Sequence, residues 1–238
     1  MRPIGFSTGA ISKGDFHFAV QRLRDNGLDV VELSALRFAE LPPLLAALPK
    51  LDLATFKFIS IHAPSRFERG LEQVVARELI EHAQELPVVV HPDVIFNPSV
   101  WAALGSRLLI ENMDKRKPIG RTLPELEQLF RELSEARFCF DLGHARQVDP
   151  SMTEAVLMLR EFGDRLAEVH VSEVNTSSRH DPISTSALRA FKSVANYIPE
   201  SVPIVIESLI DEGQSHIRRE VESARESLTA VLPAVAIA

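Results

Sequence analysis

The chain has 238 residues, 45% of them hydrophobic and 25% charged, which is the composition of an ordinary globular protein with a substantial core. Its formal net charge is −7 at pH 7 and it has no long run of lysine and arginine, so duplex DNA is a disfavoured partner. The single cysteine, Cys139, excludes an intramolecular disulfide, and the lack of a signal-peptide or membrane-spanning run favours a cytoplasmic protein with no membrane contact.

Short apolar runs alternate with longer amphipathic segments along the chain. The apolar runs predict eight strands, several of them apolar on both faces, at residues 3–6, 30–33, 58–62, 88–91, 108–111, 138–141, 168–171 and 204–207. The amphipathic segments predict helices at residues 16–26, 39–48, 71–84, 124–136, 152–162, 187–197 and 215–231. Thr122 precedes Glu125 with the spacing of a capping box, and residues 96–105 leave room for only a short helix.

This alternation predicts an α/β fold. Eight strands, each followed by a helix or a helix-sized segment, describe a single (β/α)₈ TIM barrel that spans residues 1–238 as one domain. A doubly wound open sheet fits less well, because no glycine-rich phosphate-binding fingerprint follows the first strand.

Six successive predicted strands end in a histidine or an acid. In barrel order these residues are His62, His91, Glu111, Asp141, His170 and Glu207. Active sites of such barrels lie at the carboxyl ends of the strands, so the six side chains are expected to converge. Converging buried acids and imidazoles are costly unless a cation neutralises them, and mixed histidine and carboxylate ligands suit Zn²⁺, Mn²⁺ or Fe²⁺. The sequence therefore predicts a divalent-metal site at the mouth of the barrel.

Four further residues are candidates for roles around the metal. Glu32 ends the second predicted strand and faces the same mouth, which suggests a supporting or substrate-binding role. Arg66, Arg146 and Arg179 follow strand ends and are candidates to hold an anionic part of a substrate. For each arginine the simpler interpretation is a solvated loop residue, and for any one strand-end residue it is a structural hydrogen bond or ion pair. The six strand ends together favour function.

Seven short motifs occur in order, one after another along the chain. They are IHAP, VVVHP, IEN, DLGHA, VHVSE, RHDP and IVIE, and they resemble the xylose isomerase-like TIM barrels. That superfamily includes sugar isomerases and epimerases, hydroxypyruvate isomerase and endonuclease IV. The resemblance runs from about residue 4 to residue 209, nearly the whole chain.

The sugar isomerase and epimerase branch implies one divalent metal held by Glu111, Asp141, His170 and Glu207. In this branch the two glutamates are also catalytic, because they exchange a proton with the sugar carbon, and the histidine at position 144 contacts substrate. The implied substrate is a small sugar, sugar acid or sugar phosphate.

The endonuclease IV branch implies more metal ions. His62 and His91 match ligands of a further metal that shares Glu111, and His144 and His180 match two ligands of a third. The acid expected beside His180 is replaced by Ser178, so we expect one or two metals per chain, with His180 nearer substrate than metal.

Three functions remain open from the sequence. They are a metal-dependent sugar isomerase or epimerase, a phosphate-ester hydrolase with two or three zinc ions, and a metal-binding barrel that has lost catalysis. The acidic charge and the short chain favour the first, whereas the extra histidines favour the second. The apolar segment at residues 228–238 suggests a packing tail or a contact between subunits of a homo-oligomer.

Overall fold

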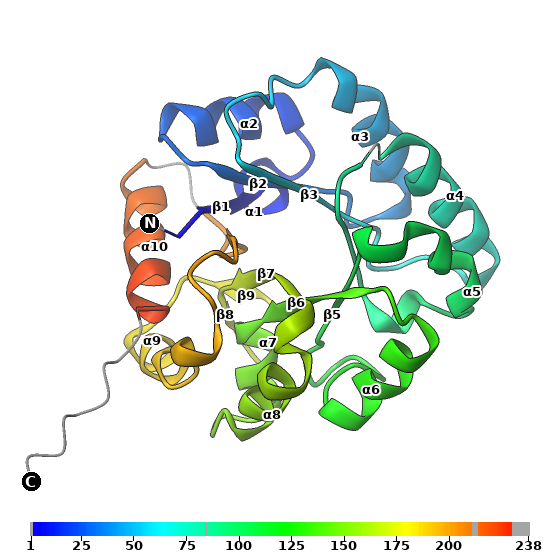
Figure 1. The fold of residues 1–238 in the computed structure, drawn as a ribbon. Coiled ribbons are helices and arrows are strands. Elements are labelled where there is room, and N and C mark those ends of the chain that lie inside the picture. The colour runs from blue at the N-terminus through cyan, green and yellow to red at the C-terminus, as the bar shows by residue number, and fades with distance from the viewer. Residues whose placement is uncertain (1, 84, 211–213, 230–238) are drawn as a thin grey trace, which may run out of the picture.

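The computed structural model describes residues 2–83, 85–210 and 214–229, in which eight parallel strands close into a barrel surrounded by helices (Figure 1). The strands follow one another around the barrel in chain order, and the last pairs with the first. They are β1 (Ile4–Ser7), β2 (Val30–Ser34), β3 (Phe58–His62), β4 (Val88–Val90), β5 (Leu108–Glu111), β6 (Arg137–Asp141), β7 (Leu166–Val171) and β10 (Ile204–Ile206). The predicted (β/α)₈ barrel is confirmed.

Helices cover the outside of the barrel. They are α1 (Thr8–Ser12), α2 (Phe16–Asp25), α3 (Leu41–Ala47), α4 (Glu72–His82), α5 (Pro98–Trp101), α6 (Leu123–Glu132), α7 (Leu142–Val148), α8 (Thr153–Phe162), α9 (Thr185–Lys192) and α10 (Gln214–Ser227). After β7 the chain also forms a small antiparallel pair, β8 (Glu173–Val174) with β9 (His180–Asp181).

The seven predicted helices are present, with ends that differ by a few residues. The predicted capping box before α6 does not form as expected: the Thr122 side chain makes no capping hydrogen bond, and Glu125 Oε2 accepts the N–H of Arg121 at 2.7 Å. Helices α1 and α7 were not predicted, because they are short, at about two turns or fewer, and show little periodicity. The predicted helix ends at residues 84 and 231, and residues 230–238 of the apolar tail, lie outside the described residues.

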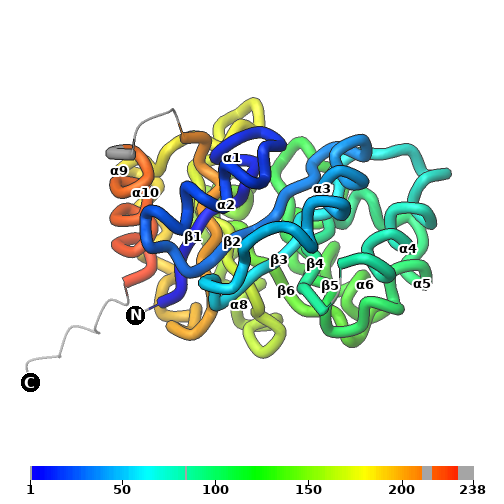
Figure 2. Tube along the Cα trace, turned by 90° about the horizontal axis from the view of Figure 1, so that it is seen from above, coloured from blue at the N-terminus to red at the C-terminus, as the bar shows by residue number. Residues whose placement is uncertain are grey.

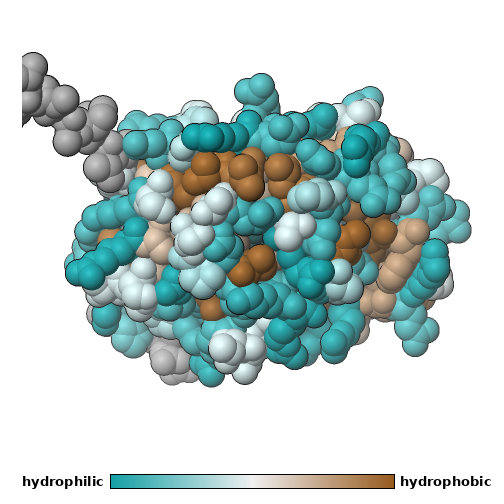
Figure 3. Space-filling view, turned by 90° about the horizontal axis from the view of Figure 1, so that it is seen from below, coloured by the Kyte–Doolittle hydropathy of each residue, from teal (hydrophilic) through white to brown (hydrophobic). Residues whose placement is uncertain are grey.

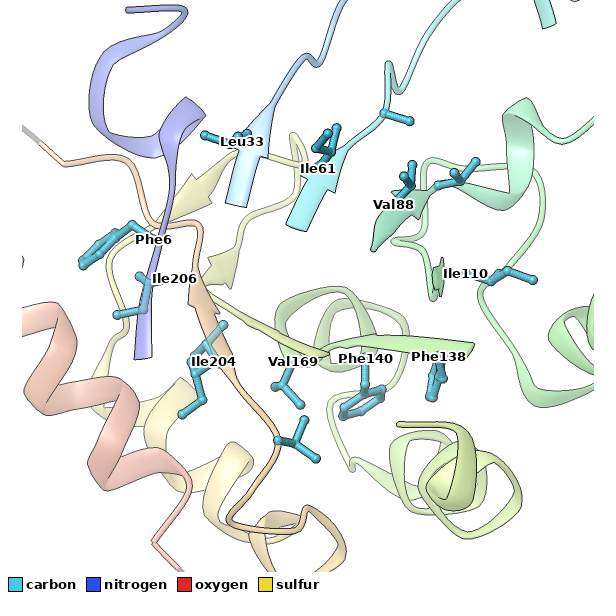
Figure 4. Close-up of a cluster of buried hydrophobic side chains, with 14 of the residues drawn as sticks. Phe6, Leu33, Ile61, Val88, Ile110, Phe138, Phe140, Val169, Ile204 and Ile206 are labelled. Atoms are coloured by element: carbon cyan, nitrogen blue, oxygen red, sulfur yellow. The ribbon is translucent and has the colours of Figure 1, made fainter. Parts of the chain in front are cut away.

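Alternate side chains of each strand point to opposite faces, and the two faces differ in polarity. The outward faces carry buried apolar residues that pack against the helices, including Phe6, Ile61 and Phe138 (Figure 4). Burying one such side chain contributes about 1.5–3 kcal/mol to stability. The inward face also holds buried polar residues such as Glu32 and Ser60. Several strands are apolar on both faces as predicted, such as β4 and β10, whereas β2 and β3 carry these polar residues inward.

All carboxyl ends of the strands open at one end of the barrel. In a view across the barrel, β1 rises from the N-terminus towards α1, which lies at that open end (Figure 2). One side of the molecule is mostly hydrophilic, with hydrophobic residues showing in several patches between the hydrophilic ones (Figure 3). Across the described ranges, no helix combines the length and apolar character that crossing a bilayer requires.

Candidate metal centre

Four strand-end residues converge at the open end of the barrel. Glu111 ends β5, Asp141 ends β6, His170 lies in β7 and Glu207 follows β10, and one ligand atom from each lies within 4.8 Å of the others. Glu111, Asp141 and His170 are fully buried, and the side chain of Glu207 is 12% exposed. Within the described residues, Asp141 Oδ2, Glu111 Oε1 and His170 Nδ1 form no hydrogen bond. This orphaned set of hard oxygens and one imidazole nitrogen fits a divalent cation.

The position of Asp141 is fixed by hydrogen bonds on three sides. Asn112 brackets its backbone, since its Nδ2 donates to Asp141 O at 2.9 Å and its Oδ1 accepts the Asp141 N–H at 2.8 Å. Asp141 Oδ1 caps α7 by accepting the His144 N–H at 2.6 Å. At Gly143 a Cβ atom would lie only 2.5 Å from Ser172 O, so glycine lets α7 approach β7 closely. Oδ2 of Asp141 is left for a ligand.

Carboxylates face both ring nitrogens of His170. Its Nδ1 faces Glu111 Oε1 at 3.3 Å, whereas its Nε2 faces Glu32 Oε2 at 3.1 Å and Glu168 Oε1 at 3.5 Å. Glu168 Oε1 also accepts a hydrogen bond from Ser60 at 2.9 Å. A carboxylate behind the second ring nitrogen favours the tautomer that leaves the first nitrogen free for a metal. Glu32, a candidate for a supporting or substrate-binding role, is fully buried beneath His170 and does not line the cavity.

His62 and His91 both face the other oxygen of Glu111. Their Nε2 atoms lie 3.3 Å and 3.0 Å from Glu111 Oε2, so these three residues form a second potential metal group. The two rings differ at Nδ1. His62 Nδ1 lies 2.8 Å from the carbonyl of Ala63 and donates to it. Burial opposes a charge on His62, but Glu32 and Glu111 raise its pKa to about 9, so a metal at Nε2 would have to displace a proton.

His91 Nδ1 instead lies 3.2 Å from Lys117 Nζ. A lysine ammonium only donates, so this nitrogen accepts, and the proton of the neutral ring resides on Nε2 facing Glu111. Burial, together with the cations His62 and Lys117, lowers the pKa of His91 to about 4. The neutral His91 therefore directs an N–H, not a lone pair, at the second potential metal position.

His144 and His180 form a third group with Asp141, again with ligand atoms within 4.8 Å of one another. His144 Nδ1 lies 3.0 Å from Asn112 O, and His180 Nδ1 lies 2.8 Å from Ser172 Oγ and 3.2 Å from Glu207 Oε2. Both histidines line the cavity described next.

A cavity of about 350 Å³ lies over the site. Its polar lining includes His62, His91, Glu111, Lys117, His144, Arg179, His180 and Glu207. Arg179 lies there as a candidate for substrate contact, although its Nε is 3.3 Å from Asp181 Oδ1. Arg66 does not line this cavity but an adjoining groove, and Arg146 is paired with Glu173 at 2.8 Å.

The two candidate catalytic glutamates differ in acidity. Burial favours the neutral form of Glu111, but His91, His144 and His170 more than offset burial and hold its pKa well below the usual value. Burial, with the negative charges of Glu111 and Asp141, raises the pKa of Glu207 to about 8 despite the opposing effect of His170. Without a metal, one carboxyl is therefore ionised and the other protonated at neutral pH, an asymmetry typical of acid–base pairs.

Three residues that contact the candidate ligands were not predicted. Glu168 lies two positions before His170 and so on the same face of β7, a signal that the strand period provides. Asn112 directly follows Glu111 within the IEN motif. Lys117 lies in the loop after β5, where no sequence pattern indicates its contact with His91.

No protein-family model and no curated protein sequence matches the chain. Solved structures do match. They include a xylose isomerase-like TIM barrel protein from Mycobacterium smegmatis in complex with magnesium (12% identity, 96% of this chain and 98% of that one, TM-score 0.59). They also include 3-keto-D-glucoside 4-epimerase from E. coli (11% identity, 95% and 99%, TM-score 0.58). A third is a candidate sugar phosphate isomerase/epimerase from Anabaena variabilis (14% identity, 92% and 88%, TM-score 0.54). The chain shares the TIM-barrel fold with these proteins, as its strand and helix pattern predicted.

Proposed function

We propose that this protein is a divalent-metal-dependent isomerase or epimerase of a small sugar, sugar acid or sugar phosphate. The observation that carries the proposal is the group of Glu111, Asp141, His170 and Glu207, with ligand atoms within 4.8 Å of one another. These four side chains suffice to hold one Zn²⁺, Mn²⁺ or Fe²⁺ ion. The 350 Å³ cavity above them lies at the lower end of the range for small-molecule sites, which supports a sugar-sized substrate.

The chemistry needs proton transfer at a carbon beside a carbonyl. A divalent ion in this site would polarise the carbonyl and the adjacent hydroxyl, which acidifies that carbon. Glu111 and Glu207 are suited to move the proton, one taking it from the carbon and the other returning one. Their strands β5 and β10 are separated by β6 and β7, so the two carboxyls reach the cavity from different directions.

His144 and His180 are suited to hold substrate hydroxyls. Each has Nδ1 engaged by the protein, through Asn112 O and Ser172 Oγ, which leaves Nε2 for a ligand in the cavity. Of the three arginine candidates, Arg179 lines this cavity and Arg66 the adjoining groove.

A phosphate-ester hydrolase is the second candidate function. The group of His62, His91 and Glu111 favours it, because a second ion sharing Glu111 would make a two-metal site. Lys117 weighs against it by keeping the His91 proton on Nε2. The third candidate, a metal-binding barrel without catalysis, is disfavoured because both proton-transfer glutamates are present.

The proposal is tested by proton exchange with solvent. Metal-loaded protein is incubated in D₂O with a panel of aldoses, ketoses, sugar acids and their phosphates, and deuterium incorporation is followed by NMR. At least one class should acquire deuterium at the carbon beside the carbonyl. Glu207→Gln should slow this by about a hundredfold or more, since general acid–base groups contribute on that scale. The matched variant Glu200→Gln changes an exposed glutamate and should have no effect.

A different outcome of these assays would identify the hydrolase. If no compound in the panel exchanges, and the protein hydrolyses bis(p-nitrophenyl) phosphate only when metal is bound, the hydrolase replaces the isomerase as the function.

A further inference from the structure

A second, larger cavity adjoins the metal cavity and has no role in the proton transfer proposed above. It measures about 660 Å³, and we call it the outer groove. It shares Leu36, Ser65, Asp114, Lys117 and Ser178 with the metal cavity, so the two spaces form one continuous mouth. Loops after β2, β3, β4 and β5 build the outer groove, together with Ser178 from the turn between β8 and β9.

Two arginines are held side by side along the outer groove. A parallel backbone bridge joins Arg37 to Arg66, and it links the loop after β2 to the loop after β3. Ser65 reinforces the bridge, since its N–H and its hydroxyl both donate to Leu36 O, at 3.1 Å and 3.2 Å. The fold therefore holds the two arginines at neighbouring backbone positions, from which both guanidinium groups can approach one anion.

Most other cations near the mouth already have partners. Lys117 Nζ lies 2.8 Å from Asp93 Oδ2, and Arg116 donates its guanidinium to the carbonyl of Ser177. Arg146 pairs with Glu173 at 2.8 Å and Arg179 with Asp181 at 3.3 Å. These contacts neutralise or occupy the cationic groups.

Arg66 and Arg37 differ from them. Arg66 makes no side-chain hydrogen bond or ion pair with any described residue. Arg37 is 3.6 Å from Glu40, but its side chain is 84% exposed, so this pair contributes little. The outer groove therefore presents the unpaired Arg66 and the weakly paired Arg37 at its rim, and its lining also includes Asp114 and Asp93, the latter paired with Lys117.

The wall of the outer groove is aromatic. The rings of Phe67 and Phe96 meet edge to face at 6.3 Å and are both partly buried. Arg69 lies over the Phe96 ring at 5.6 Å. Aromatic faces of this kind supply apolar contact area for a ring whose polar groups point elsewhere.

We propose that the outer groove holds the anionic, non-reacting end of the substrate, with its phosphate or carboxylate between Arg37 and Arg66. The anion site rests on the proposed function in one respect only, namely that the other end of the substrate is a sugar that reacts at the metal. Arg66 lines the outer groove and not the metal cavity, so an anion held there belongs to a part of the substrate that extends beyond the metal cavity. The substrate is therefore a glycoside or another sugar derivative with a second unit, which lies along Phe67 and Phe96 and carries the anion.

The test is modification of arginines by phenylglyoxal, with each modified position identified by mass spectrometry. Metal-loaded protein is treated in inorganic phosphate or in sodium chloride of equal ionic strength. Phosphate should slow modification of Arg37 and Arg66 by about fivefold or more, since a charge-assisted pair of hydrogen bonds forms there. Arg146 and Arg179, in the same sample, should react at unchanged rates. Protection at Arg179 without protection at Arg66, or no protection at tens of millimolar phosphate, overturns the proposal.

Variants separate this inference from the function it extends. Arg66→Gln should abolish the protection of Arg37 by phosphate, whereas the matched Arg179→Gln should preserve it. Asp141→Asn, expected to lose the metal, should still show protection of both arginines. A protein that fails the deuterium-exchange test but passes this one keeps its anion site and loses only the proposed reaction.

Two further probes address the length and kind of substrate. Glucose 6-phosphate should protect Arg66 no better than inorganic phosphate, within about twofold. An advantage of tenfold or more would show that one sugar links both sites and would overturn the two-unit substrate. Protection of Arg66 by a single-stranded oligonucleotide at micromolar concentration would replace the small-molecule ligand with a polynucleotide.

Discussion

The ammonium of Lys117 lies 3.2 Å from Nδ1 of His91, on the side of the ring opposite Glu111. Asp93, which accepts two hydrogen bonds from the same lysine at 2.8 Å and 3.0 Å, is 3.8 Å from that ring nitrogen. A metal-binding histidine usually donates its second ring N–H to a carboxylate or carbonyl. Lys117, which can only donate, occupies the position where that acceptor would be needed. It therefore disfavours His91 as a metal ligand.

Removing this lysine should therefore increase the number of bound metal ions. In Lys117→Met, Asp93 is released and can accept the Nδ1–H of His91, which frees Nε2 beside Glu111 and His62. Elemental analysis should give one metal per chain for the native protein and about two for the variant.

Lys115→Met is the matched control for this change. Lys115 is exposed, and its backbone N–H, rather than its side chain, makes its hydrogen bond, so metal content should stay at one. Two metals in the native protein would refute the role given to Lys117 and would strengthen the hydrolase.

Asp141→Asn should remove the metal while keeping the fold. An amide oxygen can still cap α7 at the His144 N–H, but it brings no negative charge to the site. We expect metal affinity to fall by about a hundredfold or more, measured by calorimetry with Zn²⁺ and Mn²⁺, with little change in the circular dichroism spectrum. Asp149→Asn alters a carboxylate that accepts the Glu154 N–H near the start of α8 and belongs to none of the potential metal groups, so this variant should bind metal normally. Full metal content in Asp141→Asn would refute the four-ligand assignment.

The convergence of the candidate metal ligands could be predicted because each lies where a strand ends. A strand such as residues 138–141 is apolar until Asp141, and the barrel brings all such ends to one place. The prediction did not depend on accurate boundaries, since β4 ends one residue before His91 and β10 one residue before Glu207. A boundary error of one residue does not change the predicted site, because a side chain just past the strand end still projects into the mouth of the barrel.

The residues that support the ligands were harder to predict. Lys117 reaches His91 through a loop conformation that leaves no periodic signal in the sequence. Glu32 was expected in a supporting or substrate-binding role because it ends a predicted strand, but β2 continues to Ser34, so Glu32 lies deeper in the barrel, beneath His170. Arg66 and Arg179 both follow strand ends, so the sequence does not distinguish them. The folded loops decide that Arg179 pairs with Asp181 and that Arg66 pairs with no described residue.

Glu32→Gln should weaken metal binding without removing a ligand. The carboxylate faces His170 Nε2 at 3.1 Å and holds its proton there, so that Nδ1 is free for the metal. Loss of such a partner typically costs about ten- to a hundredfold in metal affinity. Titration with Zn²⁺ against a competing chelator measures this loss. Glu40→Gln changes a glutamate near Arg37, away from the site, and should have no effect on affinity. An unchanged affinity in Glu32→Gln would show that the His170 tautomer is set by Glu168 instead.

Metal affinity should rise with pH through the neutral range. Burial opposes a charge on His170, but Cys139, Glu207 and Glu32 raise its pKa well above the usual value, and the pKa of Glu207 is raised to about 8. Both side chains therefore carry protons at pH 7 in the metal-free protein. A metal must displace those protons to use His170 Nδ1 and the Glu207 carboxylate, so binding is weakened below pH 8 and strengthens as each proton is lost.

Calorimetry in two buffers of different ionisation enthalpy gives the number of protons released by metal binding. We expect between one and two protons at pH 7 and fewer at pH 9, with a tighter apparent dissociation constant at the higher pH. In Glu207→Gln, which has no titratable carboxyl at that position, the release at pH 7 should fall by about one proton. Proton release that is independent of pH between 6 and 9 would show that neither side chain is protonated when the metal arrives.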